Sequence, residues 1–106
     1  ANDILMFAVD LTNLKIYFGK NGTWLNSGDP TSGSSGTGAY SIPVAGEWGP
    51  YSETKYGSDN VSWNMGNGFF RTTDITSAGT NASNLGRFEY DVPTGYTALC
   101  TKGLNE

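Results

Sequence analysis

Three short apolar runs separated by two turns open the chain and constrain its fold more than any other feature. The run 4–9 is apolar at every position, which is typical of a strand covered on both faces. The run 15–18 is β-branched and aromatic, and the polar segment 10–13 before it predicts an antiparallel hairpin. The Asn-Gly pair at 21–22 then predicts a tight primed turn, because both residues tolerate positive φ, with 23–25 as the return strand.

The remainder of the chain carries weaker strand signals. Residues 40–42 and 88–92 favour short strands, the latter because apolar and charged residues alternate before a proline. Over 60–65 the alternation of apolar and polar residues is clear, so we expect one face of this strand to be core and the other wet. The inward face should consist of Val61, Trp63 and Met65, packed together with Ile16 and Phe18.

Two polar segments, 26–38 and 71–86, are predicted to be long surface loops. Gly, Ser, Thr and Asn dominate both, and such a composition cannot bury enough apolar surface to offset its ordering entropy. We expect both segments to open locally at a low free-energy cost. No stretch of a dozen residues has a helical period, so the predicted fold is all-β, an antiparallel two-sheet sandwich in one domain over 1–106.

Charge and residue types argue against several function classes. The formal net charge is −4, so we expect no basic patch of the kind that binds a phosphate backbone or an anionic membrane. Nucleic acids and membranes are therefore not expected as partners. The chain has no His, the commonest general base and metal ligand. Its single cysteine, Cys100, rules out an internal disulfide. We therefore expect no enzymatic activity, no bound metal and no cofactor.

Three motif-like patterns are better explained without chemistry. The glycine-rich run 33–38 lacks the following lysine and the flanking strand and helix of a phosphate-binding loop. The 10 acidic residues are scattered, so the carboxyl pair of a glycosidase is not favoured, and the spacing of a calcium loop is missing. Asn21, Asn60 and Asn81 begin N-glycosylation patterns, which arise easily in a chain rich in Asn and Ser.

Aromatic residues near loops and turns are the candidate ligand-binding residues. Aromatic side chains make up 13% of the chain, and those at strand positions are better explained by core packing. Others fall close to predicted turns, where amphipathic rings often serve as anchors for protein or sugar ligands. These candidates are Trp24, Tyr40, Trp48, Tyr51 and Tyr56.

Three segments, in the right order, resemble the SPRY family. Residues 8–22 read Ala-Val-Asp-Leu-Thr-Asn-Leu-Lys-Ile-Tyr-Phe-Gly-Lys-Asn-Gly and resemble the family's apolar strand that ends at Asp, turns, and returns into Lys-Asn-Gly. Residues 61–66, Val-Ser-Trp-Asn-Met-Gly, are similar to its late core strand ending in Asn-Phe-Gly. Residues 93–101, Pro-Thr-Gly-Tyr-Thr-Ala-Leu-Cys-Thr, are similar to its closing segment, especially in bacteriophage and other viral structural proteins.

The resemblance implies both a fold and a role. SPRY domains are bent two-sheet sandwiches that bind protein partners through loops at one end of the sheets, and none is known for catalysis. The three segments correspond to the later part of such a domain, whose earlier strands should precede residue 1. Two departures stand out, because Leu14 occupies a position where the family often has Gly and the loop 26–38 is longer than usual.

These observations leave three candidate functions. The first is a non-catalytic recognition module of a viral or phage structural protein, such as a tail fibre, which engages a protein or a glycan through its loops. The second is a purely structural decoration or assembly domain of a virion, and the third is an intracellular SPRY adaptor for protein interactions. The low charged fraction, 15%, and the closing segment favour the first two, and with them a virion or extracellular location.

A covering partner is expected on the first strand. Residues 4–9 are apolar on both faces, so this strand would expose apolar surface and an unpaired edge if nothing covered it. Either an upstream part of the same polypeptide or a neighbouring chain should cover it. Leu5, Phe7 and Val9 would be buried on one side, and Ile4, Met6 and Ala8 on the other.

Overall fold

Short strands make up most of the regular structure. The structure, a computed structural model, describes residues 3–43, 51, 53 and 61–100. In chain order its elements are β1 (Leu5–Asp10), β2 (Lys15–Lys20), β3 (Thr23–Trp24), the 3-10 helices η1 (Leu25–Ser27) and η2 (Pro30–Ser35), β4 (Tyr40–Ser41), β5 (Phe69–Phe70) and β6 (Thr73–Asp74). All strand pairs are antiparallel and the described part holds no α-helix, so the predicted all-β class is confirmed.

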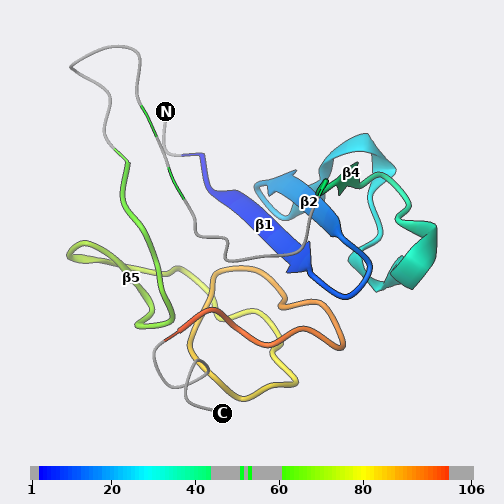
Figure 1. The fold of residues 1–106 in the computed structure, drawn as a ribbon. Helices are drawn as coiled ribbons and strands as arrows, with labels where there is room; N and C mark the ends of the chain where they lie inside the picture. The colour runs from blue at the N-terminus through cyan, green and yellow to red at the C-terminus, as the bar shows by residue number, and fades with distance from the viewer. Residues whose placement is uncertain (1–2, 44–50, 52, 54–60, 101–106) are drawn as a thin grey trace.

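β2 is the central strand of the larger sheet (Figure 1). It pairs along its whole length with β1, with Leu5 opposite Lys20 and Asp10 opposite Lys15. Its other edge pairs with β3 at one end and with β4 at the other. The hairpin predicted from the first two apolar runs is therefore confirmed, and β1 is an edge strand among the described strands.

The two turns of this sheet follow from their residue types. In the first, the Asp10 carboxylate accepts hydrogen bonds from the backbone N of Asn13 at 3.0 Å and from its Nδ2 at 2.7 Å. Leu14, at the position where SPRY domains often have Gly, adopts a left-handed φ of 55°. In the second turn Asn21 and Gly22 have φ of 50° and 89°, which confirms the primed turn predicted there.

The register divides the larger sheet into two faces, because residues directly opposite each other in antiparallel strands share a face. The inner face carries Ala8, Tyr17 and Gly19, all of which are buried. The opposite face, called the outer face below, carries Leu5, Phe7, Ile16, Phe18 and Tyr40.

The polar segment predicted as a surface loop over 26–38 forms η1 and η2, which lie against β2 and β1 respectively. The hydroxyl of Tyr17, a residue only 1% exposed, is hydrogen-bonded to Oγ of Ser32 at 3.1 Å. Asp29 caps η2 by accepting from the backbone N of Thr31 at 2.9 Å. Polar residues thus order this segment by bonding one another and by covering one aromatic ring.

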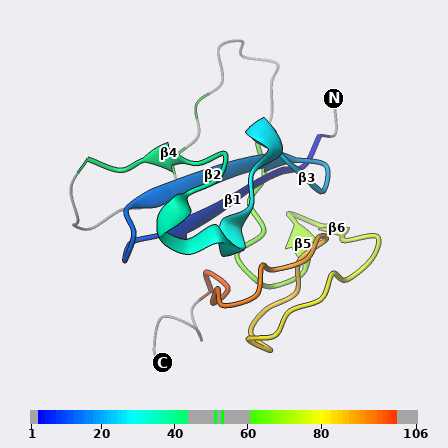
Figure 2. The same ribbon diagram turned by 90° about the vertical axis from the view of Figure 1, so that its right-hand side faces the viewer.

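The second half of the described chain has little regular structure. β5 and β6 form a short hairpin, and Leu85, Ala98 and Cys100 form a small buried cluster against which Phe88 packs. Figures 1 and 2 show most of this half beside the β1 edge of the larger sheet, away from β4. Its turns are held by side chains, as when Oδ1 of Asn64 accepts from the backbone N of Gly66 at 2.9 Å.

The predicted burial of Val61, Trp63 and Met65 is wrong. These residues are 49%, 40% and 43% exposed, and 61–65 and 88–92 form no strand. The alternation is real, but the polar side chain faces inward, since Nδ2 of Asn64 donates to the carbonyl oxygen of Arg87 at 2.8 Å.

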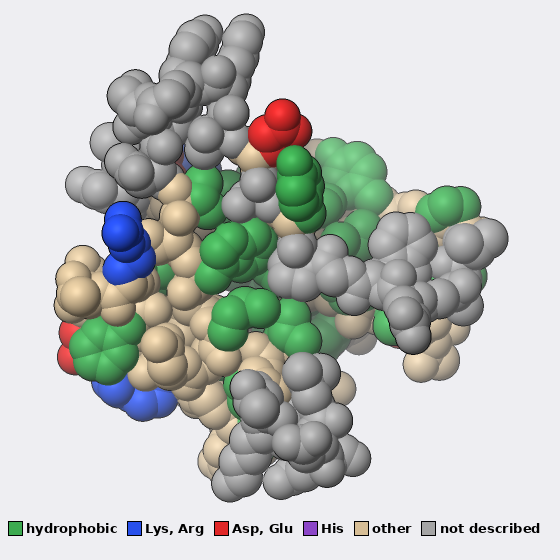
Figure 3. Space-filling model, turned by 60° about the vertical axis from the view of Figure 1, so that its left-hand side comes forward, with side chains coloured by type: hydrophobic (Ala, Val, Ile, Leu, Met, Phe, Trp, Pro, Cys, Tyr) green, Lys and Arg blue, Asp and Glu red, His purple; other side chains and the backbone are tan. Residues whose placement is uncertain are grey.

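Phe18 is likewise not a core residue. It is 43% exposed and meets Tyr40 edge to face on the outer face, with ring centroids 5.9 Å apart. Tyr17, its neighbour on the inner face, takes the buried position instead. Figure 3 shows one side of the molecule on which hydrophobic side chains gather in the centre.

Candidate functional site

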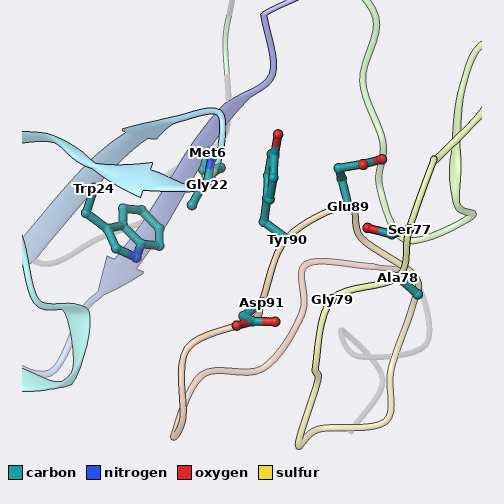
Figure 4. A pocket seen from close by; sticks show the side chains of 9 residues that line it. All are labelled: Met6, Gly22, Trp24, Ser77, Ala78, Gly79, Glu89, Tyr90 and Asp91. Atoms are coloured by element: carbon teal, nitrogen blue, oxygen red, sulfur yellow. The ribbon is translucent and has the colours of Figure 1, made fainter.

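A cavity of about 380 Å³ lies where the larger sheet meets two segments of the second half (Figure 4). The sheet contributes Met6 from β1, Gly22 from the β2–β3 turn and Trp24 from β3. The second half contributes the segments 77–79 and 89–91. Segments far apart in the sequence therefore build the cavity together.

Trp24 forms the wall on the side of the sheet. It lies opposite Gly19 on the inner face, and a Cβ atom at Gly19 would be 3.1 Å from Cε3 of the indole. Met6, opposite Gly19 on the other side, accepts a hydrogen bond at its sulfur from the backbone N of Gly22 at 3.2 Å. The absence of a side chain at Gly19 lets both larger residues pack over the strand.

Tyr90 forms a second aromatic wall by packing against the β2–β3 turn. A Cβ atom at Gly22 would lie 3.0 Å from both Cδ1 and Cε1 of the Tyr90 ring, and Gly22 has a φ of 89°. A glycine is therefore required there by both the backbone conformation and the ring. Figure 4 shows the rings of Trp24 and Tyr90 on either side of Gly22 and Met6.

The floor of the cavity is held by hydrogen bonds between 76–80 and 88–92. The backbone N of Gly79 donates to the carbonyl oxygen of Phe88 at 2.9 Å, and that of Val92 donates to Thr80 at 2.8 Å. The chains approach so closely that a Cβ atom at Gly79 would lie 2.2 Å from the carbonyl carbon of Tyr90. Only a glycine fits at this point of contact.

Two carboxylates brace the same pair of segments. Oε2 of Glu89 accepts from the backbone N of Thr76 at 2.7 Å, and Oε1 accepts from its hydroxyl. Oδ1 of Asp91 accepts from the backbone N of Thr80 at 2.7 Å. These hydrogen bonds hold the pKa of Glu89 and that of Asp91 below their ordinary values, so both groups are ionised at neutral pH.

The structure places one of the five predicted ligand residues in this cavity. Trp24 lines it, whereas Tyr40 lies on the outer face and Tyr51 is 81% exposed. The other two, Trp48 and Tyr56, lie outside the described residues. Sequence reasoning missed Tyr90, because the alternation of apolar and charged residues over 88–92 predicted only a short strand. The one available signal was its place between two carboxylates, Glu89 and Asp91.

A second, larger hollow of about 580 Å³ lies at the far end of the hairpin. The first turn, η2 and the segment 94–97 line it. Tyr96 closes one side by donating from its hydroxyl to the carbonyl oxygen of Pro30 at 2.9 Å. Burial raises the pKa of Tyr96 to about 12, and the negative charge of Asp10 adds to the shift. This hollow lacks the paired aromatic walls of the first cavity.

Two of the three glycosylation patterns have a structural role. Oδ1 of Asn21 accepts from the backbone N of Ile4 at 2.8 Å, and its Nδ2 donates to Asp3 at 2.9 Å. Nδ2 of Asn81 donates to the carbonyl oxygen of Leu85 at 2.7 Å. A glycan on either amide nitrogen would disturb these bonds. Asn60 lies outside the described residues.

Searches for other kinds of site and for relatives gave no positive result. Across 3–43, 51, 53 and 61–100, no group of three or more metal-ligating side chains is close enough to hold an ion. No helix in those ranges is long and apolar enough to cross a membrane. Comparisons with protein-family models, curated proteins and solved structures found no match to this chain.

Proposed function

We propose that this chain is a non-catalytic recognition module of a viral or phage structural protein, and that it engages a protein or glycan partner through the cavity between Trp24 and Tyr90. The observation that carries the proposal is that one cavity is lined by two aromatic residues and two acidic residues, with the Glu89 carboxylate turned towards 76–77 and away from the rings (Figure 4). Aromatic side chains are the residues on which binding energy most often concentrates. Under this proposal the chain is the later part of a SPRY-like sandwich.

The state of the carboxylates supports binding rather than catalysis. A glycosidase needs one carboxylic acid whose pKa is raised so that it can donate a proton. Glu89 and Asp91 have the opposite property, because hydrogen bonds from Thr76 and Thr80 lower their pKa values. Both groups act as fixed acceptors that position the cavity floor.

The setting on a viral particle is supported by composition and by the resemblance of 93–101 to viral SPRY segments. A polar surface with few charges suits a module that meets a host surface. The experiment is a screen of the chain against immobilised glycans and peptides, with Trp24→Ala and Tyr90→Ala as variants and Thr73→Ala, on the exposed strand β6, as the control. We expect both cavity variants to lose the ligands that wild type and control retain. Retention by both cavity variants would contradict the proposal.

A structural assembly role is the second candidate, and the outer face favours it. Leu5 is 75% exposed, and Phe7 and Phe18 are 37% and 43% exposed on the same face. Contiguous exposed apolar residues often mark a surface that another chain covers. Under this alternative a neighbouring chain, or an upstream part of the same polypeptide, docks there, and the cavity has no ligand of its own.

A further inference from the structure

We propose that the cavity between Trp24 and Tyr90 binds a cationic group, namely the ammonium or guanidinium end of a Lys or Arg side chain on a partner protein. The inference rests on the proposed function, since it names the ligand chemistry of the same cavity. It follows from two properties of the cavity, which are its charge and its aromatic walls.

The charge of the cavity comes from Glu89 and Asp91. Among the described residues that line it, none is Lys or Arg. The ion pairs in the described part are Lys20 with Asp3 and Arg87 with Asp74, so neither cavity carboxylate is neutralised by a described side chain. The hydrogen bonds that fix both carboxylates also lower their pKa values, which keeps two negative charges in the cavity at neutral pH.

These charges decide between a cationic and a neutral ligand. Both carboxylates are exposed and already accept hydrogen bonds from Thr76 and Thr80, so a cation beside them gains a Coulomb attraction that a neutral ligand lacks. A neutral sugar could donate hydroxyl hydrogen bonds but would leave both charges uncompensated. An ammonium or guanidinium group supplies both the charge and the hydrogen-bond donors.

The aromatic walls favour the same ligand. A cation is attracted to the face of Trp or Tyr when it lies within about 6 Å of the ring centroid, and Trp gives the stronger attraction. Trp24 and Tyr90 supply one ring of each kind, and the polarisable sulfur of Met6 lies between them (Figure 4). The combination of two rings with two carboxylates is suited to a cation with an apolar stem.

The cavity has room for the end of a side chain but does not select one by its size. A volume of about 380 Å³ is near the lower end of the range for small-molecule sites, about 300–1,000 Å³. A Lys or Arg stem would pack along Trp24 while its charged end reaches the carboxylates.

The test uses three small probes, n-butylammonium, n-butylguanidinium and the neutral n-butylurea. Each is titrated into the isotopically labelled chain while the backbone amide signals of Gly22, Gly79 and Tyr90 are followed by NMR. We expect both cations to shift these signals, with n-butylguanidinium binding at least about ten-fold more tightly than n-butylurea, which corresponds to about 1.4 kcal/mol. We also expect added salt to weaken the binding of the cations and not that of n-butylurea.

Two variants separate the contributions of ring and charge. Trp24→Leu keeps an apolar side chain but removes the ring, and we expect it to weaken n-butylguanidinium binding by about five-fold. Glu89→Gln removes a charge and should weaken both cations while leaving n-butylurea unchanged. Glu89→Gln also removes an acceptor of the hydrogen bonds that hold 76–80, so the amide spectrum of this variant is first compared with that of wild type. Trp24→Leu does not touch these hydrogen bonds and tests the ring separately. Thr73→Ala, on the exposed strand β6, is the control.

Failure of this inference can be told apart from failure of the proposed function. If the cations bind no better than n-butylurea, while a neutral oligosaccharide from the screen shifts the cavity signals, the cavity is a binding site but the cationic ligand is wrong. If neither the cations nor any screened ligand shifts the signals of Gly22, Gly79 and Tyr90, both are wrong.

Discussion

The ring of Trp63 meets that of Phe7 edge to face, with ring centroids 6.2 Å apart and ring planes at 79°. Phe7 belongs to the outer face of the larger sheet, so this contact fastens the segment 61–65 to β1. Both side chains stay partly exposed, Phe7 at 37% and Trp63 at 40%. The contact therefore joins the two halves of the chain without forming a closed core.

Replacing Trp63 with Ala should lower the free energy of unfolding by about 1–2 kcal/mol. A fully buried aromatic residue would give about 3–5 kcal/mol, but much of this side chain already contacts water. Urea unfolding followed by circular dichroism measures the change. Trp63→Phe, which retains an edge-to-face partner for Phe7, should recover most of the loss. A loss above about 3 kcal/mol for the Ala variant would mean that Trp63 is buried in solution.

Local patterns predicted the first half of the fold well. The apolar runs, the Asp10 turn and the Asn-Gly pair each determine their own geometry within a few residues, and the paired strands follow. Periodicity alone could not decide which side of 61–65 faces inward. In the structure Asn64 takes the less exposed side, and its amide has partners on Gly66 and, far along the chain, on Arg87.

The cavity was harder to predict because its parts are distant in sequence. Trp24 was found from its position beside a predicted turn. Tyr90 becomes a cavity residue only because Gly22 leaves room for its ring and because 76–80 pairs with 88–92. The one local signal, its place between Glu89 and Asp91, records neither of these contacts.

Asn21 should contribute to stability in two separable ways. Asn21→Ala places an Ala at a φ of 50° and removes the hydrogen bond to the backbone N of Ile4, so we expect a loss of about 1–2 kcal/mol in unfolding free energy. Asn21→Gly tolerates the left-handed backbone and loses only the hydrogen bonds, so its loss should be smaller. Chemical denaturation of both variants measures the difference, and equal losses would mean that the left-handed conformation imposes no strain.

The raised pKa of Tyr96 should make stability depend on alkaline pH. Its folded pKa of about 12 lies above the unfolded value of about 10, so its contribution is complete below pH 10 and is lost as pH rises through 12. The free energy of unfolding of wild type should therefore fall across this window more steeply than that of Tyr96→Phe. Other tyrosines and lysines titrate equally in both proteins, so parallel curves would show that Tyr96 is not shifted.

The contacts of Glu89 and Asp91 should be lost in acid. Both folded pKa values are depressed, so the hydrogen bonds to 76–80 are present above the ordinary carboxyl pKa and disappear as pH falls through the lower folded values. The amide signals of Thr76 and Thr80 should titrate with midpoints below 4.5 and 3.8, respectively. Midpoints at or above these values would mean that the carboxylates do not accept these bonds in solution.

The outer face should make the chain associate with a second copy or another partner in solution. Leu5 and Phe18 are exposed there and lie on the same face of the sheet, so apolar surface is available for a contact. Sedimentation equilibrium at several concentrations should give a mass that rises with concentration.

The double variant Leu5→Lys, Phe18→Lys should sediment as a monomer with an unchanged circular dichroism spectrum, because a charge cannot be buried unpaired at an interface. Thr73→Lys, on the exposed strand β6, should behave as wild type. A wild-type chain that stays monomeric at every concentration would remove the argument for self-association through this face.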